Sequence, residues 1–302
     1  MKTGCVVGTG GFAAVFMLAG GLATLGGVSR ESIILGQGTH SDSFVRERDI
    51  RLSNATELAI LWEGRRAGRP YYIAGDALDT VGWLFIIPTV QSLATIFGGD
   101  TNSATKLFAA CFVAPAIVSI VDFTVRAGTS SVTDRFSLFI VNHPKYDPNA
   151  PWIQALTPLQ SLELTYRVAR GRSFWLAALD DFFVTIGFIT ATFLAYTSHD
   201  VELNSCWKAL TILNIPIAFA GCVTAIVRGS EFEPALLQPL SGIWFLTFSS
   251  LILPVWLIAT STVLKANDGR GAYRPGMGVA RSMPRVDMGG SATELEMRGN
   301  AV

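Results

Sequence analysis

The chain has 302 residues, of which half are hydrophobic and only 15% are charged, and its formal net charge is zero. A water-soluble chain of this size carries about 25% charged residues, so the composition argues against a soluble protein. The zero net charge gives no indication of a nucleic-acid partner. The charges are clustered, and the gaps between them are long enough for helices of about 20 residues, which cross roughly 30 Å of hydrocarbon.

Six apolar segments meet this length requirement, and backbone groups in lipid must be satisfied within a segment, so each is expected to be a helix. The six segments are residues 6–28, 80–97, 104–125, 174–196, 209–227 and 242–264. We therefore predict an all-α, polytopic membrane helix bundle with about six transmembrane helices, formed by residues 1–265 in a lipid bilayer. Residues 266–302 are rich in Gly, Arg and Pro and are predicted to be a disordered tail.

The first segment is either a cleaved signal peptide or a retained helix. Its apolar run is longer than a signal core of 7–15 residues and no A-x-A site closes it, so we expect a retained helix. Ala19, Ala23 and Gly27 follow one another at four-residue spacing. Small residues at this spacing let another helix approach closely, and that helix could belong to a partner membrane protein or to a second copy of the chain.

The segment after the first apolar run, residues 29–78, is expected to be a loop with a short helical stretch. Ser53 to Glu57 have the pattern of a helix N-terminus, and the stretch is predicted to end near Gly64 or Gly68. Counting Lys and Arg places this loop and the loop at 126–173 in the cytoplasm, with both termini outside. The basic residues that follow the sixth segment favour the opposite orientation.

The loop at 126–173 contains a second predicted helix, with Pro158 in its first turn. Arg167, Arg170 and Arg172 gather near the end of this helix. We expect the helix to lie in the membrane interface with its arginines on anionic lipid headgroups. The alternative is a solvated basic flank that only orients the fourth span.

Two adjacent carboxylates, Asp180 and Asp181, interrupt the fourth apolar segment about 9–10 Å from its start at Phe174. An ionised carboxylate in the centre of a membrane helix costs about 2.5–3.5 kcal/mol on insertion scales. Such groups face protein or water, pair with a cation, or bind a proton. Their side chains point about 100° apart, so they are not expected to share one proton.

A third carboxylate, Asp122, lies near the end of the third segment, four residues before Arg126. If the loop between the third and fourth segments is on one side, Asp122 and the aspartate pair lie in the same leaflet. The candidate proton- or cation-binding residues are therefore Asp180, Asp181 and Asp122, with Arg126, Arg170 and Arg172 as candidate charge partners. The interpretation that we favour is that the arginines only neutralise the aspartates and fasten two helices together. A third interpretation is that the helix ends are misplaced and the aspartates simply lie at the membrane interface.

Several chemistries are not supported. The three histidines, His40, His143 and His199, all lie outside the predicted spans, which argues against haem held between helices and against an H-E-x-x-H zinc site. No phosphate-binding loop or catalytic motif is evident, and neither a metal nor a cofactor is expected. Two functions remain: a non-catalytic scaffold or membrane-complex subunit, which is favoured, and a proton- or cation-coupled transporter or channel-like protein.

Overall fold

The computed structural model describes residues 3–36, 55–99, 102–142, 158–229 and 248–267, and the regular elements in these ranges are all helices. They are α1 (Thr3–Gly36), α2 (Ala55–Ile96), α3 (Ser103–Val141), α4 (Pro158–Thr197), α5 (Ser205–Gly229), a π-helical turn η2 (Phe248–Ile252) and α7 (Leu253–Asn267). Five of them, α1 to α5, are long and apolar enough to cross a membrane. The prediction of an all-α helical bundle is confirmed, and the helices fit a multi-pass membrane protein.

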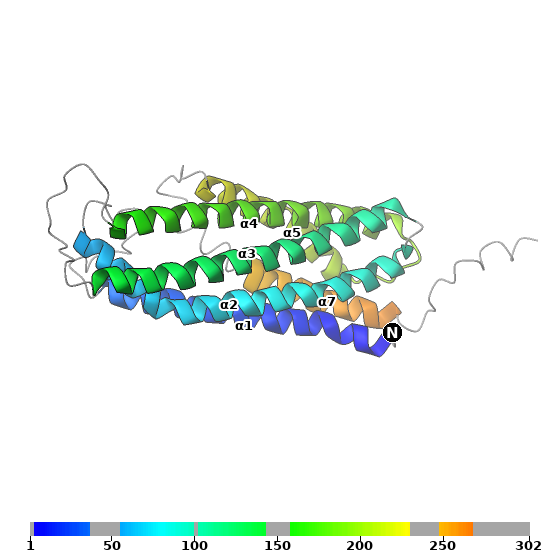
Figure 1. The fold of residues 1–302 in the computed structure, drawn as a ribbon. Coiled ribbons are helices and arrows are strands. Elements are labelled where there is room, and N and C mark those ends of the chain that lie inside the picture. Colours follow the sequence, from blue (N-terminus) through cyan, green and yellow to red (C-terminus); the bar gives the residue numbers. More distant parts are fainter. Residues whose placement is uncertain (1–2, 37–54, 100–101, 143–157, 230–247, 268–302) are drawn as a thin grey trace, which may run out of the picture.

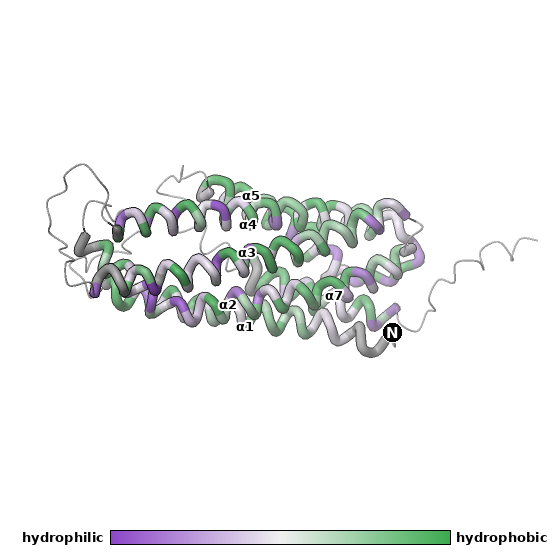
Figure 2. Tube along the Cα trace, in the orientation of Figure 1, coloured by the Kyte–Doolittle hydropathy of each residue, from purple (hydrophilic) through white to green (hydrophobic). Residues whose placement is uncertain are grey.

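The long helices lie side by side as an elongated bundle (Figure 1). Helix α1 packs on α2 and α7, α2 packs on α3, and α4 lies between α3 and α5. Helices α1 to α4 have 34 to 42 residues, which corresponds to about 50–63 Å and exceeds the roughly 30 Å of a hydrocarbon core. Figure 2 shows hydrophilic residues recurring along α2 and in the N-terminal half of α4, whereas the C-terminal half of α4 is mostly hydrophobic.

The predicted end of the first-loop helix at Gly64 or Gly68 is wrong. Helix α2 continues without a break from Ala55 to Ile96 and includes both glycines and Pro70. Gly64 lies against the side chains of α1, and a Cβ atom on Gly68 would be 2.9 Å from the backbone oxygen of Gly27. These glycines therefore permit close helix packing instead of ending the helix.

The segment 126–173 was expected to be mostly loop, and this is also wrong. Helix α3 continues to Val141, and α4 begins at Pro158 and runs unbroken to Thr197. The predicted start at Pro158 is correct, but its helix is continuous with the fourth apolar segment and is not a separate interfacial helix. Residues 143–157, 242–247 of the sixth apolar segment, and 268–302 of the predicted tail lie outside the described residues.

Helices α1 and α2 meet along small residues. A Cβ atom on Gly20 would be 2.9 Å from the backbone oxygen of Gly75 and 3.1 Å from the backbone nitrogen of Asp79. Gly27 of the predicted small-residue row also lies in this contact, where a Cβ atom would be 2.8 Å from the ring of Tyr72. The helix that approaches this face of α1 is therefore α2 of the same chain.

The largest apolar core lies where the mainly hydrophobic segments of α1, α2 and α4 meet, and it includes Met17, Ile86 and Phe188. Its centre is aromatic: the rings of Phe112 and Trp256 are stacked at 5.5 Å, and the ring of Phe188 meets Phe112 edge-on at 5.3 Å. The indole nitrogen of Trp256 donates to Thr211 Oγ1 at 2.9 Å. This core fills one half of the bundle, and the buried ion pair of Arg65 with Glu163 lies in the other half beside a smaller apolar cluster that includes Leu58 and Trp62.

Candidate functional site

A cavity of about 340 Å³ lies in the polar half of the bundle and is lined by residues of α1 to α5 and by Phe248 of η2. Its volume is within the range of about 300–1,000 Å³ that is typical of small-molecule sites. The lining includes Asp76 and Arg126, which lie at the level where the apolar segments of α2 and α3 end. The cavity therefore extends from the polar ends of the helices to the edge of their apolar segments.

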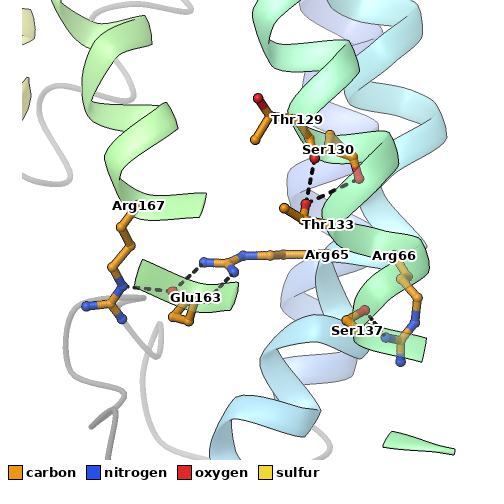
Figure 3. A network of polar contacts seen from close by, with 8 residues as sticks. All are labelled: Arg65, Arg66, Thr129, Ser130, Thr133, Ser137, Glu163 and Arg167. Carbon is orange, nitrogen blue, oxygen red and sulfur yellow. Dashed lines mark hydrogen bonds and ion pairs between the residues drawn. The ribbon is translucent and has the colours of Figure 1, made fainter. Parts of the chain in front are cut away.

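A buried ion pair between Arg65 of α2 and Glu163 of α4 lies at the polar end of the cavity (Figure 3). Arg65 donates to both carboxylate oxygens of Glu163, from Nη1 at 2.6 Å and from Nη2 at 3.2 Å. Arg167 donates from Nε to Glu163 Oε1 at 2.7 Å. The guanidinium of Arg65 also lies over the rings of Trp62, at 4.8 Å, and Tyr166, at 4.2 Å. These contacts join α2 to α4 through charged and aromatic groups.

Further polar contacts join α1, α2 and α3 along the same cavity. The Tyr72 hydroxyl donates to Glu31 Oε2 at 2.7 Å, and Arg69 Nη2 donates to Ser131 Oγ at 2.9 Å. The neighbouring hydroxyl group of Thr133 donates to the Thr129 carbonyl oxygen in its own helix at 2.7 Å. Arginines and hydroxyl groups thus form much of the wall between α2 and α3.

Deeper in the bundle, Arg126 connects two carboxylates. Its Nη1 atom is 2.9 Å from Asp76 Oδ1 on α2 and 3.6 Å from Asp122 Oδ2 on its own helix. The hydroxyl group of Ser173 on α4 donates to Asp122 Oδ1. The sequence placed Asp122 and Arg126 together, and the structure adds Asp76 and Ser173 to the cluster.

A second, smaller cavity of about 60 Å³ shares Asp76, Asp122 and Arg126 with the first. Its other charged lining residues are Asp79 and Asp180, so four carboxylates and one guanidinium surround it. The volume is larger than the 10–15 Å³ that one water molecule requires. The Oδ1 atom of Asp180 is buried and has no hydrogen-bond partner among the described residues.

Asp181 faces the larger cavity instead of the smaller one. It is only 8% exposed, and within the described part of the chain its carboxylate forms neither an ion pair nor a hydrogen bond. The carboxylate lies on Gly221 of α5, where a Cβ atom would be 2.6 Å from Asp181 Oδ2. The adjacent aspartates thus line different cavities, in agreement with their expected divergence of about 100° along a helix.

The candidate charge partners fall into three different positions. Arg126 lies at both cavities and pairs with Asp122, whereas Arg170 lines the larger cavity with its guanidinium 5.6 Å from the ring of Phe174. Arg172 is exposed and lines neither cavity. Among the described ion pairs, none joins an arginine to Asp180 or Asp181.

The two alanines of the predicted small-residue row do not belong to the site. Ala19 and Ala23 are half-buried on α1 and lie outside the linings of both cavities.

Several site residues were not singled out from the sequence, namely Glu31, Arg65, Arg69, Tyr72, Asp76, Asp79, Glu163 and Tyr166. A signal was present for two of them: Asp76 and Asp79 are three residues apart and directly precede the second apolar segment. At that spacing they share a face only if the helix already exists there. Because residues 29–78 were predicted to be a loop, no shared helix face was predicted for this pair.

The carboxylates are distributed around the two cavities and are not gathered as ligands of one metal ion. Within the ranges that the structure covers, no group of three or more His, Cys, Asp or Glu side chains could hold a metal. Neither family models, nor curated proteins, nor solved structures match this chain. Its function must therefore be inferred from the fold and from the geometry of this site.

Proposed function

We propose that this multi-pass membrane protein is a proton-coupled transporter of a small polar solute. The solute occupies the larger cavity, and the aspartates that line the two cavities bind and release the protons. The observation that supports this most directly is the position of Asp181, a carboxylate that is 8% exposed, lines a cavity of about 340 Å³ and has no partner among the described residues.

The physical argument starts from the free energy of burying a carboxylate. A buried charge without a counter-ion is strongly unfavourable, by several kcal/mol. Among the described residues, neither the Asp181 carboxylate nor the Oδ1 atom of Asp180 forms an ion pair or a hydrogen bond that would offset this cost. Carboxylates that do not stabilise the fold and that line a cavity are candidates for ion handling.

The neighbouring groups suit proton movement. The small cavity brings Asp79 and Asp180 next to the Asp76–Arg126–Asp122 cluster, with space for water between polar side chains. Carboxylates and water can pass protons from one to the next. We assign the proton as the coupling ion, because Asp181 and the Oδ1 atom of Asp180 have no cationic side chain paired with them among the described residues.

The scaffold function, which the sequence favoured, makes no use of a solvent-sized cavity or of an unpaired buried carboxylate. A scaffold in which arginines neutralise the aspartates would place guanidinium groups beside Asp180 and Asp181. The described ion pairs instead join Arg126 to Asp76 and Asp122, and Arg65 and Arg167 to Glu163. We therefore prefer transport.

The test is a flux measurement in vesicles. The purified full chain is reconstituted into liposomes that contain a pH-sensitive dye, and a pH gradient is imposed with and without a potassium diffusion potential. A mixture of small polar solutes is added on one side of the membrane, because a coupled transporter moves protons only together with its solute. We expect solute-dependent proton flux above that of protein-free vesicles, and we expect Asp181→Asn to abolish most of it.

The matched control is Asp200→Asn, which makes the same chemical change at an exposed residue after α4 and should leave the flux unchanged. Equal flux in the two variants, or no flux above empty vesicles for the folded wild-type protein, would reject proton-coupled transport. Flux driven by a sodium gradient alone would reject the proton as the coupling ion.

A further inference from the structure

The polar end of the larger cavity has a chemical character of its own. We use the name basic half for the part lined by Trp62, Arg65, Arg69, Tyr166 and Arg170. Three of these five residues are arginines, whereas the aspartates of the same lining are at the deeper end. We propose that the basic half binds an oxyanion, the carboxylate or phosphate group of a solute or lipid. This proposal rests on the proposed transport function, because it names the class of molecule that would be carried.

The first argument is the donor content of the wall. A guanidinium carries five N–H donors and no acceptor, and its planar arrangement matches carboxylate and phosphate groups. Arg69 comes from α2 and Arg170 from α4, so a ligand between them would contact both helices. Ser130 and Thr129 of α3 add hydroxyl groups to the same lining.

The second argument is independent of the arginines and concerns a buried donor that lacks an acceptor. The indole nitrogen of Trp62 is buried in a residue that is 2% exposed, and it has no hydrogen-bond partner among the described residues. Tyr166, which lines the same cavity, is half-buried. Buried polar groups in folded proteins are generally satisfied, so the unpartnered N–H group of Trp62 at this cavity indicates that a ligand with an acceptor oxygen binds there.

The third argument is the arrangement of charge along the cavity. Glu163 balances Arg65 from outside the cavity lining, and its side chain is fully buried. Glu31 lines the same cavity and accepts the hydroxyl hydrogen of Tyr72. The deep end, in contrast, contains Asp181 and the Asp76–Arg126–Asp122 cluster. An anion in the basic half and a proton on a deep aspartate would enter the cavity together without a large net charge.

The experiment measures binding and does not require transport. The full chain is purified in a non-ionic detergent, and its thermal unfolding midpoint is followed by tryptophan fluorescence at constant ionic strength. The probes are inorganic phosphate and succinate, with chloride as the reference anion. A second arm compares nanodiscs of phosphatidylcholine with nanodiscs that also contain phosphatidylglycerol. We expect a saturable rise of the midpoint with at least one oxyanion.

The variants are Arg170→Gln and, as the matched control, Arg172→Gln, which removes the same charge from an exposed residue of the same helix. We expect Arg170→Gln to weaken binding by about ten-fold to a hundred-fold and Arg172→Gln to change it by less than about two-fold. Tyr166→Phe removes only the hydroxyl group and should weaken binding by about three-fold to ten-fold. This variant also provides the test if Arg170→Gln does not fold.

A response to phosphate or succinate identifies a soluble oxyanion, whereas a response only to phosphatidylglycerol identifies a lipid headgroup. The proposal is overturned if neither arm shows saturable binding, or if Arg170→Gln and Arg172→Gln have equal effects while Tyr166→Phe has none. Proton flux without oxyanion binding would reject this inference and leave the transport function in place. Oxyanion binding without proton flux would reject the proposed transport function and leave the oxyanion site in place.

Discussion

The ion pair between Arg65 and Glu163 should be one of the largest single contributions of a polar contact to the stability of the bundle. The Glu163 carboxylate is completely buried and accepts N–H groups from Arg65 at 2.6 and 3.2 Å and from Arg167 at 2.7 Å. Glu163→Gln retains the shape but removes the charge, and it leaves Arg65, which is 8% exposed, without the carboxylate that pairs with it. Breaking a buried pair in this way costs about 3–5 kcal/mol.

The assay is equilibrium unfolding of the purified protein in mixed micelles with increasing sodium dodecyl sulfate, followed by circular dichroism. Glu63→Gln provides the matched control, because Glu63 is exposed on the same helix as Arg65, and it should change the free energy of unfolding by less than about 0.5 kcal/mol. The double variant Arg65→Met, Glu163→Gln should recover most of the loss, since no unpaired buried charge remains. A loss for Glu163→Gln no larger than that for Glu63→Gln would refute the assignment of this pair as a buried structural contact.

Two further predictions concern helix packing and the cavity aspartates. Gly20→Ala should lower the free energy of unfolding by about 1–3 kcal/mol, because the added Cβ atom would meet the backbone of α2 at 2.9 Å. Gly11→Ala is the control, because a Cβ atom on Gly11 would have no neighbouring atom within 4 Å among the described residues. It should be neutral or raise the free energy of unfolding by up to about 1 kcal/mol. Equal losses for the two variants in the same unfolding assay would show that α1 and α2 are not in close contact. Asp76→Asn should lower stability by about 1–2 kcal/mol because it weakens the contact with Arg126. Asp180→Asn should be neutral or stabilising, because the Oδ1 atom of Asp180 has no hydrogen-bond partner within the ranges that the structure covers. A larger loss for Asp180→Asn than for Asp76→Asn would contradict the description of Asp180 as a group that does not stabilise the fold.

The class of fold could be predicted from the sequence because the signal was local. Runs of about 20 apolar residues leave few alternatives to transmembrane helices. The lengths of the helices could not be predicted in the same way. The extensions of α2 and α3 beyond their apolar segments contain glycines, arginines and hydroxyl residues, which resemble loop residues. They are helical in a bundle where Gly68 lies on α1 and Arg65 pairs with α4.

The residues of the candidate site likewise fall into those that the sequence singled out and those that it did not. Asp122, Asp180 and Asp181 stood out because each carboxylate lies in or at an apolar segment, where charge is costly. Glu163 and Asp76 did not stand out, because charged residues are ordinary in a presumed loop. Whether they face a cavity depends on the approach of α2 to α4 and α3, which is a property of the tertiary structure and not of any local sequence pattern.

The most direct measurement for proton coupling is infrared difference spectroscopy of the protein reconstituted in lipid. Spectra would be recorded for the wild-type protein and for Asp181→Asn while the pH is stepped down and back up, and the carboxylic-acid C=O stretch would be compared. We expect a reversible carboxylic-acid band in the wild-type protein that is missing from Asp181→Asn and retained in Asp200→Asn. Identical difference spectra for the wild-type protein and Asp181→Asn would contradict the claim that this carboxylate binds and releases a proton.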